Sequence, residues 1–240
     1  MWLRFGDTQI HVDPGPGALV RALSHVPPCN PRELDALVLS HKHLDHSGDV
    51  NALVEAMTSG GFRRRGALFA PADAFDHEPV VLPYVRQYLE RLVRLEPHSG
   101  PYRIGATELR TSIAHVHAVQ TYGLHFACDG VRVAYVPCGR YFDGLAEDYA
   151  SLRPDVMIVN VLRFRDGIDA DHLTWEQAGE FIGGVRPRVA IFQHFGTKML
   201  EADPVRLAQE LEDRLGLRVI AAYDGLTVDF DVEAASVGAD

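Results

Sequence analysis

Four side chains that commonly coordinate metals stand within six consecutive positions of the chain, in the segment "LSHKHLDHSGD". They are His41, His43, Asp45 and His46. The apolar run "DALVL" just before them is typical of a buried strand, and the "GDVNALVEAM" that follows has the spacing of an amphipathic helix that begins near Ser47 or Gly48. The cluster therefore occupies the loop at the carboxyl end of a strand, the edge at which α/β proteins bind ligands. Imidazole and carboxylate groups suit zinc, manganese or iron, so the segment predicts a metal site.

The remaining pattern of the chain alternates strands and helices. With 240 residues, 47% of them hydrophobic, the chain can bury a large core, and no linker-like segment divides it. We therefore expect one α/β domain over residues 1–230, followed by a flexible acidic tail at 231–240. Further expectations concern single segments. We expect a helix within 80–93, hairpins that turn at Gly6-Asp7, Asp129-Gly130 and Asp224-Gly225, a capping box of Thr174 and Gln177 that opens the helix "TWEQAGEFIGGV", and a helix bounded by Pro204 and Gly216.

Charge and cysteine content limit the classes of partner. The formal net charge of −10 disfavours nucleic acid, and the three consecutive arginines at 63–65 are interpreted as a solvated turn. Three cysteines without a CxxC spacing argue against a disulfide framework. No secretory leader or membrane-spanning apolar run is visible in the sequence, so we expect a cytoplasmic protein with no membrane partner.

The HxHxDH segment resembles the signature of the metallo-β-lactamase superfamily, and the rest of the chain fits its ribonuclease Z and phosphodiesterase branch. His117 precedes "AVQTYG" with the spacing of that branch, whereas His115 is a nearby alternative. His194 ends a late apolar strand in "VAIFQHFG", and "IHVDPGPG" carries Asp13 in a family-like setting. The resemblance implies a four-layered αββα sandwich of the metallo-β-lactamase type.

The same resemblance implies two divalent metal ions, with zinc favoured over manganese or iron. One ion would be held by His41, His43 and His117. The second would be held by Asp45, His46 and His194.

The sequence departs from the family pattern where most two-metal members carry a bridging aspartate. The corresponding segment, "VAYVPCGRYF", offers Cys138 instead. A thiolate is a good zinc ligand, so Cys138 can complete the second site. Two alternatives stay open: Cys138 is a small buried residue that leaves the second site weak, or Asp143 reaches back to replace the aspartate.

A second departure lies at the N-terminus, where only "MWLRFG" precedes the strand "TQIHVD". Family members commonly have another strand there. An exposed sheet edge would favour pairing between chains, so we expect a homo-oligomer.

The resemblance also suggests how such a site would work. A metal-activated hydroxide would attack the substrate while Asp45 orients it. The segment "DADHLTWEQA" is similar to the "HST" segment that supplies a catalytic histidine in the phosphodiesterase branch, which makes His172 the candidate general acid, with Asp169 or Asp171 holding its tautomer. The alternative is a surface histidine near a helix cap.

We therefore expect a metal-dependent hydrolase acting on a small-molecule phosphodiester. Ribonuclease Z activity on RNA is less favoured, because no long basic arm is visible and the net charge is acidic. The same site could hydrolyse an ester, thioester or lactone. The rival from another class is a non-catalytic metal-binding or redox-sensing protein in which Cys138 closes the second site.

Overall fold

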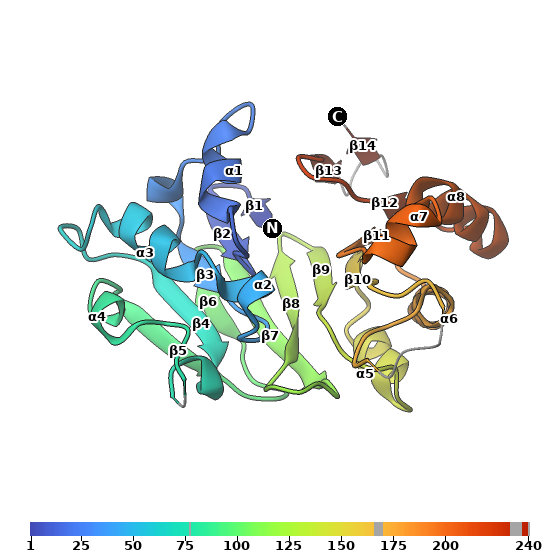
Figure 1. The fold of residues 1–240 in the computed structure, drawn as a ribbon, viewed down its shortest axis with the longest axis horizontal. Coiled ribbons are helices and arrows are strands. Elements are labelled where there is room, and N and C mark those ends of the chain that lie inside the picture. The colour runs from blue at the N-terminus through green and yellow to red at the C-terminus, as the bar shows by residue number, and fades with distance from the viewer. Residues whose placement is uncertain (77, 166–169, 231–236, 240) are drawn as a thin grey trace. The chain divides into compact units, whose positions relative to one another are not determined.

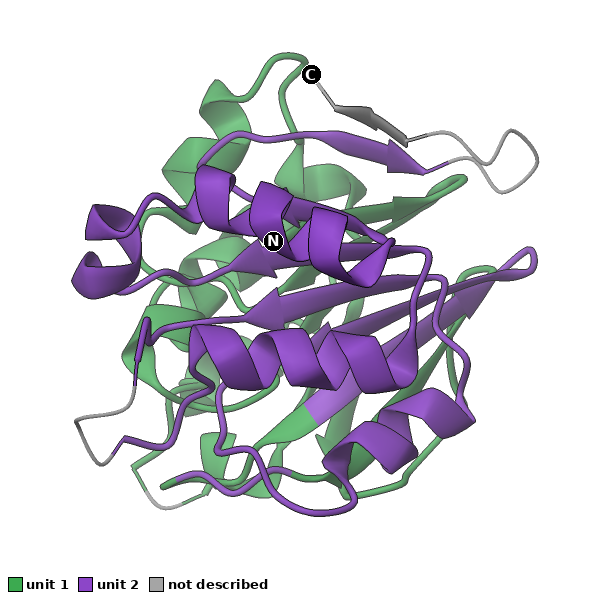
Figure 2. Ribbon diagram, turned by 90° about the vertical axis from the view of Figure 1, so that its right-hand side faces the viewer, with its two compact units in different colours: residues 1–114, 118–122 green, residues 115–117, 123–240 purple. Residues whose placement is uncertain are grey.

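The computed structural model describes residues 1–76, 78–165, 170–230 and 237–239. The chain forms two compact units, the first made of residues 1–114 and 118–122 and the second of residues 115–117 and 123–240 (Figure 2). The expected single domain over residues 1–230 stays a prediction. Most of the expected tail at 231–240 lies outside the described residues.

The first unit is built on a five-stranded sheet of order β1-β2-β3-β4-β5 (Figure 1). Its strands are β1 (Trp2–Phe5), β2 (Thr8–Val12), β3 (Ala36–Val38), β4 (Ala67–Pro71) and β5 (Arg91–Leu95). The predicted β1–β2 hairpin is confirmed, and the other neighbours pair in parallel. Parallel pairing brings the carboxyl ends of β2, β3 and β4 to one edge, and the predicted metal-binding segment follows β3.

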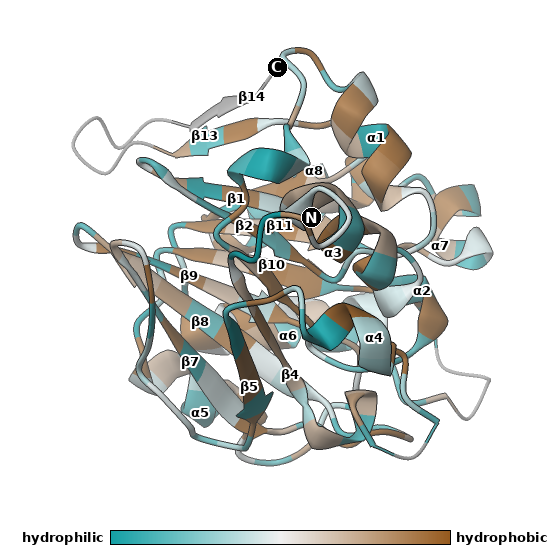
Figure 3. Ribbon diagram, turned by 90° about the vertical axis from the view of Figure 1, so that its left-hand side faces the viewer, coloured by the Kyte–Doolittle hydropathy of each residue, from teal (hydrophilic) through white to brown (hydrophobic). Residues whose placement is uncertain are grey.

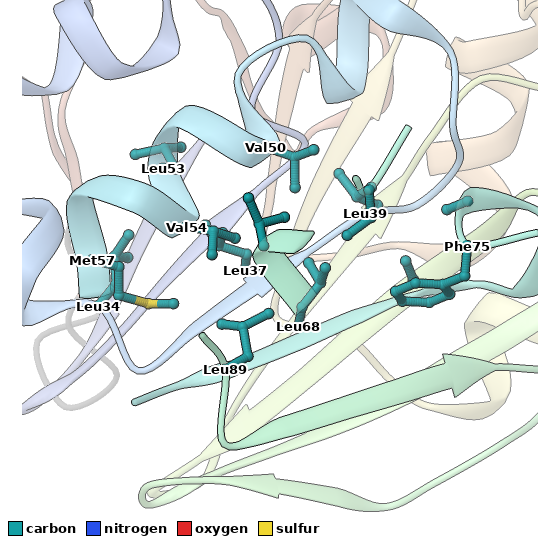
Figure 4. Packing of buried hydrophobic residues seen from close by; sticks show 14 residues of the cluster. Leu34, Leu37, Leu39, Val50, Leu53, Val54, Met57, Leu68, Phe75 and Leu89 are labelled. Atoms are coloured by element: carbon teal, nitrogen blue, oxygen red, sulfur yellow. The ribbon is translucent and has the colours of Figure 1, made fainter. Parts of the chain in front are cut away.

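Helices of the first unit connect these strands, and an antiparallel hairpin completes the unit. The helices are α1 (Ala18–Ser24), α2 (Leu44–Ser47), α3 (Val50–Thr58) and α4 (Pro83–Arg86), with short 3-10 turns at Pro31–Glu33 and Ala72–Ala74. The hairpin consists of β6 (Tyr102–Ile104) and β7 (Thr107–Ala114). In Figure 4, Leu53, Val54 and Met57 of α3 lie with Leu37 and Leu68 of the strands in one buried cluster. This burial fixes α3, and with it the short helix before it, against the sheet.

The sequence-based expectation for residues 80–93 is wrong in extent. The segment forms only the one-turn helix α4, and a strand, β5, begins at Arg91. The helical signal came from Val81, Val85 and Leu89, whose spacing of four matches one helix face, and all three are buried in the core cluster. One helical turn and the residues that follow it bury these side chains as well as a longer helix would. The chain then forms strand β5 by pairing with β4.

The second unit contains a sheet in which the strands run in the order β12-β11-β10-β9-β8. They are β8 (Tyr122–Cys128), β9 (Val131–Val136), β10 (Val156–Asn160), β11 (Val189–Gln193) and β12 (Arg218–Ala221). β8 and β9 form the predicted hairpin, whereas β9 to β12 pair in parallel. Hydrophobic residues follow the strands and hydrophilic ones the turns (Figure 3), as expected for a sheet that is largely buried.

Helices cover one face of this sheet (Figure 2). They are α5 (Leu145–Ser151), α6 (Trp175–Val185), α7 (Thr197–Glu201) and α8 (Pro204–Leu215). The predicted capping box at the start of α6 is confirmed, because the Thr174 side chain accepts from the Gln177 amide and the Gln177 side chain accepts from the Thr174 amide. α8 begins at a proline and ends before Gly216, as expected.

The expected C-terminal hairpin is wrong. β12 pairs in parallel with β11, whereas β13 (Val228–Phe230) pairs with β14 (Val237–Ala239). The turn at Asp224-Gly225 therefore separates two strands that do not pair with each other. Within the described ranges, no helix is long and apolar enough to cross a membrane.

Candidate metal centre

The predicted ligands of the first unit gather at the carboxyl end of β3. His41 and His46 are buried, His43 is half-buried, and the Asp45 side chain is 62% exposed. The His41 ring lies 5.0 Å from that of His43 and 4.1 Å from that of His46, centroid to centroid. Asp45 Oδ2 lies 3.5 Å from His46 Nε2. Four donor groups thus share one small region.

The local conformation of this segment differs from the expected open loop. Asp45 and His46 belong to the one-turn helix α2, and α3 starts later, at Val50. The preceding "PGPG" turn packs closely on this helix because Gly15 has no side chain. A Cβ at Gly15 would lie 2.0 Å from the backbone oxygen of Asp45. Only glycine fits at this contact.

Two side chains behind the cluster orient two of its imidazoles. Ser40 Oγ donates to Asp13 Oδ2 at 2.5 Å, so it accepts at 2.9 Å from the Nδ1 of His41. His46 also donates to Asp13, since its Nδ1 lies 3.0 Å from the same carboxylate oxygen. Both rings therefore carry their proton on Nδ1 and keep the lone pair of Nε2 for a ligand, as metal-binding histidines do.

The carboxyl group of Asp13 remains ionised in this setting. Burial would raise its pKa, but the hydrogen bond and charge of His46, the charge of His41 and the hydrogen bond from Ser40 together lower the pKa below its ordinary value. A carboxylate behind two imidazoles raises their basicity as ligands. The donor set of the first unit therefore fits a divalent metal of the zinc type.

The second unit brings three of the predicted residues together. The ring of His172 lies 5.4 Å from that of His117 and 6.2 Å from that of His194, centroid to centroid. His194 follows β11 with a φ of 62°, a left-handed conformation that costs a non-glycine residue about 1–3 kcal/mol and is concentrated at functional sites. The alternative histidine, His115, is buried and hydrogen-bonded at 2.9 Å to the hydroxyl of Tyr149.

Cys138 is also part of this group. It is 2% exposed, and its Sγ lies 3.9 Å from His194 Nε2 and 3.5 Å from Asn160 Nδ2. The other residue considered for this role, Asp143, is exposed on the turn before α5. The three cysteines of the chain form no disulfide bond.

The loop that carries His172 is held by arginines. Arg140 forms an ion pair with Asp171, and Arg163 donates to the backbone oxygens of Ala170 and His172. Asp171 therefore pairs with Arg140 and does not bind the His172 ring. The buried Nδ1 of His172 has no hydrogen-bond partner among the described residues. Asp169, the other residue expected to orient the ring, lies outside the described residues.

Sequence reasoning missed three contributors to these two groups: Ser40, Asn160 and Gln193. Ser40 stands beside His41 in the motif, so its adjacency was a usable signal. Asn160 and Gln193 end β10 and β11 at the same register position, where the Gln193 amide donates to Asn160 at 3.0 Å. Their roles depend on strand pairing, which the sequence pattern did not reveal.

Curated relatives of the chain include proteins from archaea and bacteria. An uncharacterized protein of Methanocaldococcus jannaschii is 29% identical over 93% of this chain and 84% of its own length. The probable metallo-hydrolase YhfI of Bacillus subtilis is 27% identical over 72% of this chain and 70% of its own. A ribonuclease Z of Kineococcus radiotolerans is 29% identical over 76% of this chain and 56% of its own.

The fold is likewise that of known proteins. The crystal structure of YhfI, a metallo-β-lactamase fold protein, matches with a TM-score of 0.76 at 20% identity, covering 100% of this chain and 90% of that one. This likeness confirms the predicted fold class. The family model described as the β-lactamase superfamily domain matches residues 8–195, more than half of the chain. The chain therefore belongs to the β-lactamase superfamily, and its relatives include a probable metallo-hydrolase and a ribonuclease Z.

Proposed function

We propose that this protein is a metal-dependent phosphodiesterase that hydrolyses a small phosphodiester at a centre of two zinc ions. The observation that carries the proposal is the position of His172, whose ring lies beside those of His117 and His194. A histidine next to predicted metal ligands, on a loop held by two arginines, has the placement that a general acid needs. The ribonuclease Z relative, which belongs to a group that cleaves phosphodiesters, supports the same reaction class.

The ligands are proposed as the family pattern assigns them. His41, His43 and His117 hold one ion, and Asp45, His46 and His194 hold the second, with Cys138 in the place of the usual aspartate. Two bound divalent ions would lower the pKa of water and stabilise charge on the phosphate oxygens.

The protein's own groups supply the remaining chemistry. Asp45, the most exposed of the four clustered groups, accepts a hydrogen bond from the attacking water and so orients it. His172 donates a proton to the leaving oxygen. Ser40 and Asp13 keep the rings of His41 and His46 in the tautomer that ligation requires.

Steady-state hydrolysis of bis(p-nitrophenyl) phosphate by zinc- or manganese-loaded protein tests this function. We expect turnover that a chelator abolishes, and that His172→Ala lowers by about 10²-fold or more, the contribution typical of a general acid. His98→Ala, which removes an exposed histidine, is the matched control and should retain full turnover.

Metal-replete protein without turnover would refute the phosphodiesterase. Lactones, thioesters and carboxylic esters would then be the next substrates, because the same Lewis-acid chemistry activates a carbonyl. Equal turnover of His172→Ala and wild type would remove His172 from the reaction.

A further inference from the structure

A chain of hydrogen-bonded amides ends at the sulfur of Cys138. Gln193 Nε2 donates to Asn160 Oδ1 at 3.0 Å, and Asn160 Nδ2 reaches Cys138 Sγ at 3.5 Å and the Tyr135 hydroxyl at 3.0 Å. Asn160 and Cys138 are each 2% exposed. Buried polar groups in such a network take one orientation, because any other leaves a donor or acceptor unsatisfied.

The direction of the first hydrogen bond sets the direction of the next. Because the Gln193 amide nitrogen can only donate, the oxygen of the Asn160 amide must face it. The NH₂ group of Asn160 is then directed at the sulfur, which must accept. An amide donor orients a sulfur as an acceptor and ligand, and it offers no acceptor to a thiol hydrogen.

The position of the sulfur relative to His194 matches shared coordination. With bond lengths of about 2.3 Å to sulfur and 2.0 Å to nitrogen and a tetrahedral angle, two ligands of one zinc ion lie roughly 3.6 Å apart. The distance between Cys138 Sγ and His194 Nε2 is 3.9 Å. A small rotation of either side chain closes the difference.

We propose that Asn160, oriented by Gln193, is a positioning residue that holds Cys138 Sγ as a ligand of the metal bound by His194. The inference rests on the proposed metal centre and deepens it. Because thiolate ligands favour soft and borderline ions, this site binds zinc or cobalt more tightly than manganese or magnesium.

Titration of the metal-free full-length protein with cobalt(II) tests the inference, because a cobalt–thiolate bond gives a sulfur-to-metal charge-transfer absorption in the near ultraviolet. The wild type should develop this band. Cys138→Ser should lose it, and Cys128→Ser, which alters another buried cysteine, should keep it.

Two variants reverse the hydrogen bond to the sulfur without altering the sulfur itself. Asn160→Asp replaces the donor by a carboxylate of the same size. Gln193→Glu places an acceptor against Asn160 Oδ1 and so turns the amide, which then presents its oxygen to Cys138. Both should weaken the cobalt affinity read from this band by about 10–100-fold, the usual effect of losing a residue that orients a ligand.

Tyr135→Phe is the matched control, because it removes the other partner of the Asn160 donor and leaves the donor free for the sulfur; its cobalt affinity should stay within a few-fold of the wild type. If Asn160→Asp does not fold, Gln193→Glu decides alone. Wild-type affinity in the folded variants, or a band that survives in Cys138→Ser, would overturn the inference.

This readout needs no substrate, so it separates the two proposals. The charge-transfer band without phosphodiester hydrolysis would refute the proposed activity and leave the role of Asn160 intact. Phosphodiester hydrolysis without the band would refute the role of Asn160 and leave the proposed activity intact.

Discussion

At the scale of single residues, the orientation of the imidazole rings matters as much as the presence of histidines. His41 and His46 reach their tautomers through Ser40 and Asp13, two residues that bind no metal in the proposed centre. The Asp13 carboxylate stays charged because His46, His41 and Ser40 lower its pKa against the opposing effect of burial. Ser40 and Asp13 therefore set the orientation and tautomer of the metal-binding histidines without binding the metal themselves.

Ser40→Ala tests this role. The substitution removes the acceptor for His41 Nδ1 and one donor to Asp13, so we expect zinc affinity to fall by about 10–100-fold. Competition against a chromophoric chelator measures it. Ser24→Ala, at an exposed position on α1, should bind zinc like the wild type. Equal affinities in the two variants would rule out an orienting role for Ser40.

At the scale of elements, the start of α6 sets where the His172 loop ends. The capping box at Thr174 and Gln177 comes two residues after His172, and an isolated backbone bridge joins Thr174 to Arg163, which itself holds the loop. Helix capping and loop anchoring thus act on one short segment.

Thr174→Ala should destabilise the protein by about 1 kcal/mol, because the Gln177 amide loses its side-chain acceptor. Urea unfolding followed by circular dichroism would show a lower midpoint with an unchanged slope. Gln177→Glu keeps the capping box and should retain the wild-type midpoint within about 0.5 kcal/mol. A Thr174→Ala midpoint equal to that of the wild type would mean that α6 needs no cap.

At the scale of the whole molecule, buried histidines link stability to pH. Burial is the main reason that the pKa of His11, which packs edge-on against Trp2, lies well below its ordinary value. Below pH 6.5 the unfolded chain binds a proton at this residue and the folded chain does not. The free energy of unfolding must therefore fall as the pH decreases, by up to about 1.4 kcal/mol per pH unit from this group.

His11→Gln should flatten that dependence. Urea unfolding of metal-free wild type and variant between pH 7 and pH 5 measures the two slopes, and their difference isolates His11 from the other titrating groups. Parallel curves would show that His11 makes no contribution of this kind.

The sequence by itself determined the elements whose signals are local. The β1–β2 and β8–β9 hairpins, the capping box of α6 and the proline and glycine that bound α8 were all predicted, because turn and cap chemistry acts over two to four residues. The cluster from His41 to His46 was equally visible, since its residues are consecutive.

The tertiary structure decided what depends on distant partners. Residues 80–93 end in a strand because β4 offers a free edge, and the segment after α8 does not form a hairpin because β11 pairs with β12. Asn160 meets Cys138, and Asp13 meets His46, only through strand pairing and loop packing. Such contacts depend on burial and on hydrogen bonds between residues far apart in the chain, and no short sequence window contains both partners.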